Sequence, residues 1–391
     1  MRRGAAVALL LAVAVLVAAG CGGGSTSHGT ATEGRLGTVT IAGRGKPGST
    51  PPKDVAGGQS AVRTLTLRQE IGQRMVFAYS GTRPPEALKR RIRRGEAAGV
   101  ILFARNITTA AQLRTQMAAL QRLRGPLDRG LPLLVMVDQE GGAVRRLPGG
   151  PLRAPGQTRD AADARRLGSS AAAALKRAGA NVDIAPVVDV ARAGSAMAAE
   201  GRAYGSAPDR VAARADAFAR GLRADGVHPV YKHFPGFGAA TVNTDDAAAR
   251  IDLPLSALRA ADLKPYNNVD PDAVMVSTAI YPRVDPRPAV FSRRWVTQEL
   301  RDGIKGYKNV VTMTDDLQAP AVARYGTSAQ LAFFAMTAGV DLPVFAKDYM
   351  SADRAARGLE QAVRSGKLSR QELAAGVQRV RAWRARLNTG P

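Results

Sequence analysis

The sequence predicts a (β/α)₈ barrel of the TIM type, formed by a single domain over residues 63–391. From residue 65 onward, short apolar runs alternate with segments of helical periodicity. Most of the runs are apolar throughout, which is typical of strands buried on both faces of a parallel sheet. Eight such repeats fit the length of a TIM barrel. A doubly wound open sheet is the alternative, but no GxGxxG motif follows the first run.

Eight strands are expected, one in each apolar run. In chain order they span residues 74–79, 99–103, 133–137, 181–186, 228–231, 273–277, 309–314 and 339–344. The segments between them place apolar residues three or four positions apart, as in helices with one buried face. Each strand is therefore expected to lead into a helix.

Three of these helices are specific enough to predict residue by residue. The helix at residues 111–123 follows two N-cap candidates, Thr108 and Thr109. Its buried face is expected to contain Leu113, Met117, Leu120 and Leu123. The helix at residues 211–222 is expected to bury Val211, Ala215, Phe218 and Leu222. The last helix is expected to bury Leu373, Val377, Val380 and Trp383. The arginines of this last helix are expected to face mostly outward: Arg379, Arg381, Arg384 and Arg386.

Residues 1–21 are similar to a lipoprotein signal peptide. Arg2 and Arg3 precede an apolar stretch, and small residues then lead to Cys21. The apolar stretch is too short and too rich in alanine for a comfortable membrane span. The arrangement resembles a bacterial lipobox, whose cysteine is acylated and becomes the mature N-terminus. The alternative is an ordinary secretory signal with an incidental cysteine. We expect an extracytoplasmic, membrane-anchored bacterial lipoprotein in which residues 22–62, rich in Gly, Ser, Thr and Pro, form a flexible tether.

The chain carries 56 Lys and Arg against 32 Asp and Glu, a net charge of +24. The excess is mostly arginine, spread over helix faces such as residues 379–386, without a nucleic-acid motif. We therefore expect a monomer with no nucleic-acid partner. The charge is suited to anionic lipid headgroups or wall polymers, or it reflects an arginine-rich proteome without a selected partner. One cysteine excludes a disulfide framework, and with three histidines no metal or organic cofactor is implied.

Polar residues gather near the ends of the expected strands, where TIM barrels place their chemistry. Carboxylates lie at or near the ends of several strands: Asp138, Glu140, Asp183, Asp189, Asp315, Asp316 and Asp341. The fifth strand ends in Lys232 and His233, and Arg146 and Arg202 lie in neighbouring loops. For any single carboxylate a structural ion pair is an equally good explanation. The whole set indicates sugar chemistry, because glycosidases use one carboxylate as nucleophile and a second group as acid/base.

Six motifs occur in order: GVILFARN at 99–106, VDQEGG at 137–142, APVVDV at 185–190, RAYG at 202–205, KHFPG at 232–236 and MTDDL at 313–317. Together they resemble glycoside hydrolase family 3, specifically its single-barrel β-N-acetylglucosaminidases that act on cell-wall fragments. The resemblance covers residues 65–387, nearly all of the expected domain. It implies a retaining hydrolase that removes terminal β-linked N-acetylglucosamine, or a related β-sugar, from cell-wall-type glycans.

The resemblance also implies roles for individual residues. Asp315 matches the nucleophile that forms the covalent glycosyl-enzyme intermediate. Five residues match those that bind the sugar in the subsite before the scissile bond: Asp138, Arg146, Arg202, Lys232 and His233. Neighbours on a regular strand point to opposite faces, so the chain is expected to leave strand geometry at Lys232 and His233.

The chain departs from the family pattern at the acid/base. In the family, the Lys-His-Phe-Pro-Gly motif is followed by His-Gly, four variable residues and Asp-Ser-His or Asp-Thr-His. The last histidine, paired with its aspartate, protonates the leaving group. Here Asn243 stands in place of the aspartate and Asp245 in place of the histidine. One hypothesis is that Asp245 or Asp246 acts as the acid/base, which requires a raised pKa.

Two other hypotheses stand beside it. In the first, the barrel is catalytically impaired and acts as a carbohydrate-binding surface lipoprotein, since a fold does not fix a function. In the second, Lys232 forms a Schiff base, which requires a desolvated amine. The His-Phe-Pro-Gly that follows Lys232 belongs instead to the sugar-binding motif.

Overall fold

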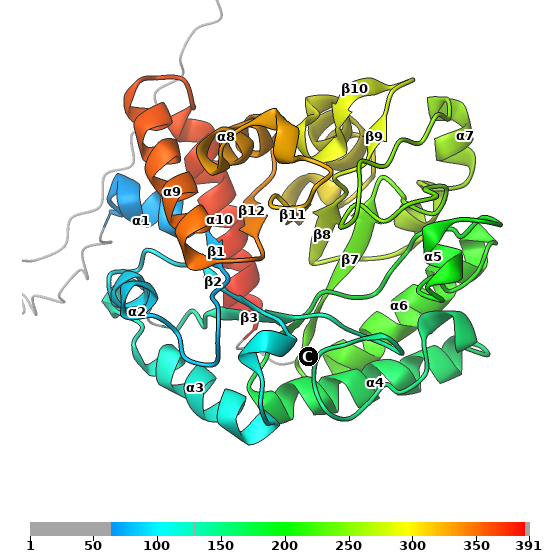
Figure 1. Cartoon of the computed structure of the whole chain (residues 1–391), viewed down its shortest axis with the longest axis horizontal. Helices are drawn as coiled ribbons and strands as arrows, with labels where there is room; N and C mark the ends of the chain where they lie inside the picture. Colours follow the sequence, from blue (N-terminus) through cyan, green and yellow to red (C-terminus); the bar gives the residue numbers. More distant parts are fainter. Residues whose placement is uncertain (1–63, 129, 388–391) are drawn as a thin grey trace, which may run out of the picture. The chain divides into compact units, whose positions relative to one another are not determined.

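Eight parallel strands close into a barrel in the computed structural model, which describes residues 64–128 and 130–387 (Figure 1). The strands are β1 (Val76–Phe77), β2 (Gly99–Leu102), β3 (Leu134–Val137), β6 (Val182–Asp183), β7 (His228–Phe234), β8 (Ala273–Val276), β11 (Val311–Asp316) and β12 (Leu342–Phe345). Around the ring their order is β1, β12, β11, β8, β7, β6, β3 and β2. Each strand overlaps one of the predicted runs, so the predicted (β/α)₈ TIM-type barrel is confirmed.

Helices follow the strands and form the outer layer (Figure 1). The α-helices are α1 (Leu67–Gly72), α2 (Glu86–Arg93), α3 (Ala110–Arg122), α4 (Ala161–Ala178), α5 (Ala196–Ala199), α6 (Pro208–Ala224), α7 (Leu255–Ala260), α8 (Ser328–Ala338), α9 (Tyr349–Arg364) and α10 (Arg370–Arg386). Between β8 and β11 the chain forms a π-helix, η6 (Arg294–Asp302). Short 3₁₀ turns are η1 (Ala104–Asn106), η2 (Pro126–Asp128), η3 (Pro155–Gln157), η4 (Lys264–Asn268), η5 (Ala289–Phe291), η7 (Tyr307–Asn309) and η8 (Ala323–Tyr325). Two antiparallel hairpins lie outside the barrel sheet: β4 (Gln139–Gly141) with β5 (Val144–Arg145), and β9 (Ile280–Tyr281) with β10 (Asp285–Pro288).

The three helices predicted residue by residue are present. α3 begins after its N-cap Thr109, whose side chain accepts a hydrogen bond from the Gln112 N–H at 3.0 Å. The predicted apolar faces of α3, α6 and α10 are buried, except that Leu123 is half-buried at the C-cap of α3. Local periodicity and capping were therefore sufficient to predict these elements.

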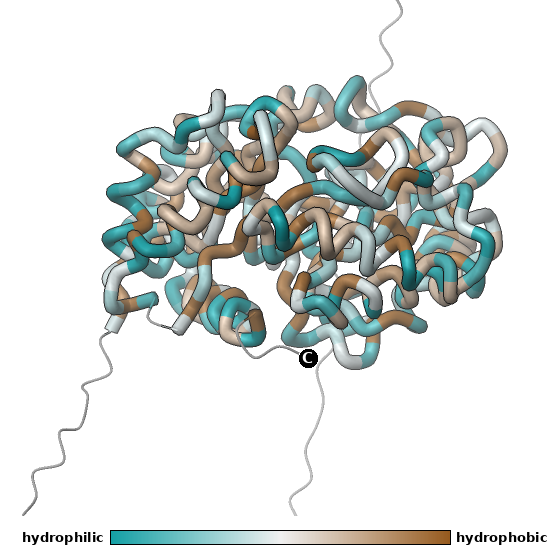
Figure 2. Tube along the Cα trace, turned by 90° about the horizontal axis from the view of Figure 1, so that it is seen from below, coloured by the Kyte–Doolittle hydropathy of each residue, from teal (hydrophilic) through white to brown (hydrophobic). Residues whose placement is uncertain are grey.

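Apolar side chains fill the inside of the barrel as well as the layer between strands and helices. The inner cluster takes residues from strands around the ring: Val76, Ile101, Leu134, Met136, Val182, Val230, Met275, Met313 and Val344. Trp383 of α10 is fully buried and belongs to the same cluster. In Figure 2, hydrophobic and hydrophilic segments alternate along the outer part of the chain, as expected for helices that pack one face on the core.

One carboxylate predicted at the catalytic rim lies at the other end of the barrel. Asp341 precedes β12 and is fully buried at the amino ends of the strands. It pairs with Arg301 at 2.6 Å and with Arg379 of α10 at 2.7 Å. The expectation that Asp341 contributes to a pocket at the carboxyl rim was therefore wrong: β12 begins at Leu342, three residues later than the predicted strand, so Asp341 lies before its amino end.

The orientation predicted for Arg384 was also wrong. This arginine of α10 is fully buried, pairs with Asp128 at 3.0 Å and donates to the carbonyl of Pro132 at 2.8 Å. α10 packs at the amino end of the barrel. Its Trp383 contacts the inner cluster, and its Arg384 contacts the segment that leads into β3. The helical period therefore gave the correct apolar face but not the surroundings of the opposite face.

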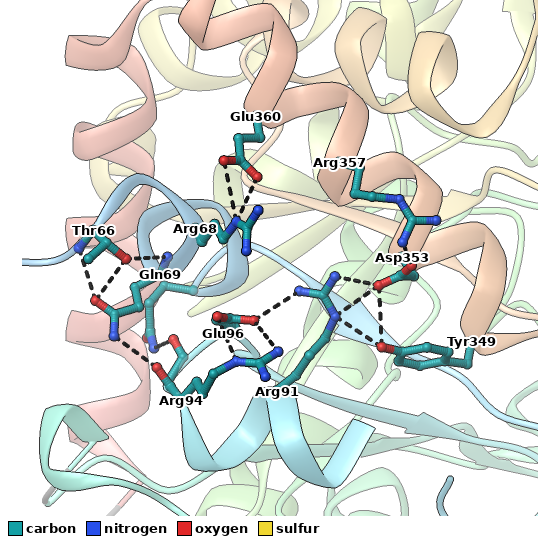
Figure 3. A network of polar contacts seen from close by, with 12 residues as sticks. Thr66, Arg68, Gln69, Arg91, Arg94, Glu96, Tyr349, Asp353, Arg357 and Glu360 are labelled. Atoms are coloured by element: carbon teal, nitrogen blue, oxygen red, sulfur yellow. Dashed lines mark hydrogen bonds and ion pairs between the residues drawn. The ribbon is translucent and has the colours of Figure 1, made fainter. Parts of the chain in front are cut away.

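Ion pairs connect α2 to α9 on the outside of the barrel (Figure 3). Arg91 lies between Asp353 and Glu96, and Arg94 donates to Glu96 at 2.9 Å. These groups border a cavity of about 400 Å³. Because the guanidinium groups of Arg91 and Arg94 already bind carboxylates, we interpret this cavity as part of the helix packing.

Within residues 64–128 and 130–387, no helix combines the length and apolar content needed to cross a membrane. The predicted signal peptide (1–21), its Cys21 and the predicted tether (22–62) lie outside the described residues. Their assignments therefore stay predictions.

Candidate active site

A cavity of about 400 Å³ opens at the carboxyl ends of the barrel strands. All seven residues predicted to bind sugar or to catalyse line it: Asp138, Arg146, Arg202, Lys232, His233, Asp245 and Asp315. Its floor is formed by apolar side chains of the inner cluster: Ile101, Ile184, Met275 and Val344. Barrel closure thus brings together side chains from segments far apart in the sequence.

Lys232 is the centre of a buried cluster of ion pairs. Its ammonium lies 2.7 Å from Asp138 and 2.6 Å from Glu140. Arg202 donates to both oxygens of Glu140, at 2.8 and 2.9 Å. Burial alone would lower the pKa of Lys232, but the two carboxylates outweigh burial and raise the pKa. Lys232 is therefore held as an ammonium, which disfavours the Schiff-base hypothesis because a nucleophilic amine must lose its proton.

Glu140 is a site residue to which the sequence analysis gave no role. Burial alone would raise its pKa, but Arg202 and Lys232 hold the pKa well below the usual range. Glu140 therefore stays a carboxylate and holds in place Lys232 and Arg202, two residues predicted to bind sugar. Its position in the VDQEGG motif was visible in the sequence, but its partners come from loops that only the fold brings near.

Lys232 and His233 both line the cavity although they are neighbours on β7. The pairing of β7 with β8 shifts register between Tyr231 and Phe234. The peptide between Lys232 and His233 is cis. The predicted departure from regular strand geometry is therefore confirmed. His233 Nδ1 lies 2.7 Å from Asp189, a fully buried carboxylate at the end of the APVVDV segment whose role the sequence did not reveal.

Asp315 and Asp316 end β11 and both line the cavity. One Asp315 oxygen accepts the Asp316 N–H at 2.8 Å, and the Thr244 hydroxyl lies 3.5 Å from the other. Asp316 accepts the backbone N–H groups of Gln318 and Ala346, each at 2.9 Å. Burial is the main cause that raises the pKa of Asp316 to about 6, and Asp315 adds to it. Asp316 thus joins the ends of β11 and β12 beside the predicted nucleophile.

Asp245 lies at the mouth of the cavity, in the loop that follows β7. Partial burial first, and the Asp315 carboxylate second, raise the pKa of Asp245 above the usual range. A raised pKa is the property that a carboxyl group needs to act as proton donor. Asp245 and Asp246 are both exposed, but only Asp245 lines the cavity.

Asn243 connects the loop that contains Asp245 to the residues predicted to bind sugar. Its side-chain oxygen accepts the Asp245 N–H at 3.1 Å, and its amide donates to Glu200 at 3.0 Å. Glu200 also pairs with Arg202 at 3.1 Å. A continuous series of polar contacts results, from the sugar subsite to the loop: Asp138, Lys232, Glu140, Arg202, Glu200, Asn243 and Asp245.

Arg146 follows the β4–β5 hairpin and lines the cavity. Its side chain forms no hydrogen bond or ion pair within residues 64–128 and 130–387, and its Nε is buried. The guanidinium is therefore free to donate to a ligand. In the same part of the chain, no group of three or more His, Cys, Asp or Glu side chains is arranged to hold a metal ion.

Comparison with known proteins identifies the family. The profile described as "Glycosyl hydrolase family 3 N terminal domain" matches residues 66–382. The chain belongs to glycosyl hydrolase family 3. An uncharacterized secreted glycosyl hydrolase of Arthroderma benhamiae is 35% identical over 338 residues, which are 83% of this chain and 95% of that protein. A β-hexosaminidase of Pseudomonas aeruginosa is 36% identical over 279 residues, 69% of this chain and 81% of that enzyme.

Solved structures of family 3 enzymes share this barrel. The β-N-acetylglucosaminidase of a Paenibacillus species superposes with a TM-score of 0.77 at 29% identity, over 84% of this chain but 64% of that chain. The β-N-acetylhexosaminidase of Beutenbergia cavernae superposes with a TM-score of 0.74 at 28% identity, over 82% of this chain and 99% of that enzyme. This family 3 barrel is thus similar to β-hexosaminidases in both sequence and fold.

Proposed function

We propose that this family 3 barrel is a retaining glycoside hydrolase that removes terminal β-linked N-acetylglucosamine, or a related β-sugar, from cell-wall-type glycans. The observation that carries the proposal is the convergence of all seven predicted site residues on one cavity. The relatives described as β-hexosaminidase and β-N-acetylhexosaminidase support the sugar and the type of bond.

In the proposed mechanism Asp315 is the nucleophile. Its carboxylate attacks the anomeric carbon while the bond to the leaving oxygen breaks and Asp245 gives that oxygen its proton. The sugar is then joined to Asp315 as an ester. In the second step the ionised Asp245 takes a proton from water, and the water oxygen attacks the anomeric carbon and releases Asp315. Two inversions retain the β configuration.

The remaining site residues bind the sugar. Asp138 accepts, and its carboxylate has the two-pronged geometry that bridges neighbouring hydroxyls. Arg202 uses its Nε and one terminal nitrogen to bind Glu140 and donates to the sugar through its remaining N–H groups. Arg146 offers a guanidinium that no described residue uses. The contacts through Glu200 and Asn243 connect Arg202, which binds the sugar, to the loop that positions Asp245.

Hydrolysis of phenyl β-N-acetylglucosaminide tests the proposal. Asp315→Asn is expected to lower kcat by at least about 10³-fold, because the covalent step loses its nucleophile. Turnover that survives Asp315→Asn unchanged would remove Asp315 from this role. Sugar binding by calorimetry without any turnover, in folded wild-type protein, would instead select the catalytically impaired, carbohydrate-binding alternative.

We further propose that the barrel is held outside the cytoplasm by a lipid on Cys21, with residues 22–62 as the tether. Residues 1–21, which resemble a lipoprotein signal peptide, support both export and the lipid. The secreted relative from Arthroderma benhamiae supports export but not the lipid. Mass spectrometry of the mature N-terminal peptide is expected to show an acylated Cys21. Cleavage at another residue, with an unmodified cysteine, would indicate the ordinary secretory signal.

A further inference from the structure

Charge is divided unequally between two halves of the barrel. Residues 181–316, which include β6, β7, β8 and β11, contain 17 Lys and Arg and 17 Asp and Glu. The rest of the described chain includes β12, β1, β2 and β3, and contains 31 Lys and Arg against 13 Asp and Glu. These four strands are neighbours in the ring. The excess positive charge therefore lies on one contiguous half of the barrel.

One strongly basic part of this half is the outer wall formed by α2 and α3. Residues 80–127 contain ten Lys and Arg against two Asp and Glu. Five arginines there are exposed, and their side chains form no hydrogen bond or ion pair within residues 64–128 and 130–387: Arg83, Arg90, Arg93, Arg114 and Arg122. We call them the α2–α3 arginines. Arg90 and Arg93 lie near enough to Glu86 to help lower its pKa. In Figure 1 the two helices follow one another around the barrel.

The described chain begins beside this wall. Thr64, the first described residue, lines a surface hollow together with Arg93 and Arg94. Forty-two residues separate Thr64 from Cys21. Even a fully extended segment of that length reaches only about 150 Å. With the proposed lipid anchor, the domain therefore stays near the membrane, where its effective concentration is high.

We infer that the α2–α3 arginines dock the barrel on an anionic lipid surface. Guanidinium groups suit phosphate oxygens, and attraction to an anionic leaflet adds up over the basic residues that reach it. None of these five arginines forms an ion pair with another described residue, so docking breaks none. The inference rests on the proposed lipid anchor, which brings the domain to the membrane. The arginines that contact the lipid belong to the folded domain.

Docking through this wall leaves the active site accessible. The cavity opens at the carboxyl ends of the strands, and none of the α2–α3 arginines lines it. The neutral half, which includes Asp315 and Asp245, lies on the far side of the ring from β1 and β2. Glycan therefore reaches the cavity from beside the membrane, without displacing the docked wall.

Sedimentation with vesicles tests the inference. A chain of residues 22–391 contains the whole barrel and carries no lipid, so any binding comes from the protein itself. We expect it to bind phosphatidylcholine vesicles that contain about 30 mol% phosphatidylglycerol, but not phosphatidylcholine alone. Binding is expected to weaken as NaCl rises from about 50 to about 500 mM, because salt screens exposed charges. Replacing the five α2–α3 arginines by Gln is expected to lower the partition coefficient at least about tenfold.

A matched variant removes the same charge from the neutral half. It combines Arg210→Gln, Arg250→Gln, Arg283→Gln, Lys305→Gln and Lys308→Gln, all of which are exposed and without side-chain partners in the described chain. This variant is expected to bind anionic vesicles within about twofold of wild type. Equal losses of vesicle binding in the two variants would overturn the inference, because the net charge of the protein alone would then explain the binding.

Two further measurements distinguish a failure of the docking inference from a failure of the proposed function. Binding to soluble polyglutamate without binding to anionic vesicles would overturn the inference in favour of an anionic polymer. Both five-residue variants are expected to hydrolyse a soluble aryl glycoside at the wild-type rate, which also shows that they fold. Loss of vesicle binding with hydrolysis intact therefore concerns docking alone, whereas absence of hydrolysis in wild type concerns the proposed function.

Discussion

At the scale of single residues, the proposed acid/base Asp245 differs from a histidine in how it must hold its proton. An unperturbed imidazole has a pKa near 6.5, whereas a carboxyl group must be shifted upward to keep its proton near neutral pH. Here burial and the Asp315 carboxylate supply that shift. In the proposed mechanism Asp315 becomes a neutral ester in the intermediate, so its negative charge no longer raises the pKa of Asp245. The pKa of Asp245 should then fall, which suits its change from acid to base.

Asp245→Asn is expected to discriminate between substrates by their leaving groups. With phenol, whose oxygen needs a proton, kcat/KM should fall about 10²- to 10⁴-fold. With 2,4-dinitrophenol, which leaves as the anion, the loss should be less than about tenfold. Asp246→Asn is the control and should match wild type, because Asp246 does not line the cavity. Equal losses on both substrates would argue against proton donation by Asp245.

The pH profile provides a second check on Asp245. A general acid contributes only while protonated, so activity should be present below its pKa and decline as the pH rises through it. Because burial and Asp315 raise the pKa of Asp245, the alkaline limb of kcat/KM should lie above the ordinary value of 3.8. The limb should vanish in Asp245→Asn with the phenyl glycoside. A limb at the ordinary value would contradict the structure.

At the scale of elements, hydrogen bonds rather than regular secondary structure position the loop after β7. An asparagine at 243 donates to Glu200 and accepts from the backbone of Asp245. An aspartate there, as in the family motif, would face Glu200 with like charge and without a donor. The asparagine at 243 is therefore compatible with both of its neighbours, Glu200 and Asp245.

Asn243→Ala is expected to release this loop. With phenyl β-N-acetylglucosaminide kcat should fall about tenfold with little change in KM, because Asp245 loses its position while the sugar subsite stays intact. The dinitrophenyl glycoside should be affected less. Thr241→Ala, at an exposed position in the same loop, is the matched control and should behave as wild type. A loss in Asn243→Ala that is the same for both leaving groups would point to a general structural role.

At the scale of the whole molecule, buried ion pairs close the amino end of the barrel while the active site occupies the carboxyl end. Asp341 and Asp128 each hold a buried arginine there, Arg301 and Arg384 respectively. Replacing Arg384 leaves the buried Asp128 with one longer ion pair, to Arg381 at 3.6 Å. A buried charge that has lost its main partner costs more than the pair itself contributes.

Arg384→Met is therefore expected to lower the free energy of unfolding by about 3–5 kcal/mol, measured by urea denaturation. Adding Asp128→Asn should restore part of the loss, because the stranded carboxylate is removed. Arg165→Met, on an exposed arginine of α4, should change the free energy by less than about 0.5 kcal/mol. A loss in Arg384→Met as small as that of Arg165→Met would mean that Asp128 is not stranded.

The sequence was informative wherever the signal is local. Apolar runs predicted the eight strands, and helical period with capping predicted α3, α6 and α10. The motifs predicted which side chains meet in the cavity, because the carboxyl ends of barrel strands converge. Glu140 and Asp189 stayed without roles because their partners, Arg202 and Lys232 for one and His233 for the other, lie on other segments.

The sequence by itself determined the fold class and predicted which residues line the cavity at the carboxyl ends of the strands. Only the tertiary structure decided the burial of Arg384, the location of Asp341 and the division of charge between two halves. Residues 64–180 and 317–387 lie far apart along the chain, yet they form one basic half because β1 pairs with β12. A net charge of +24 is a sum over the chain, whereas the face that carries it depends on which strands are neighbours.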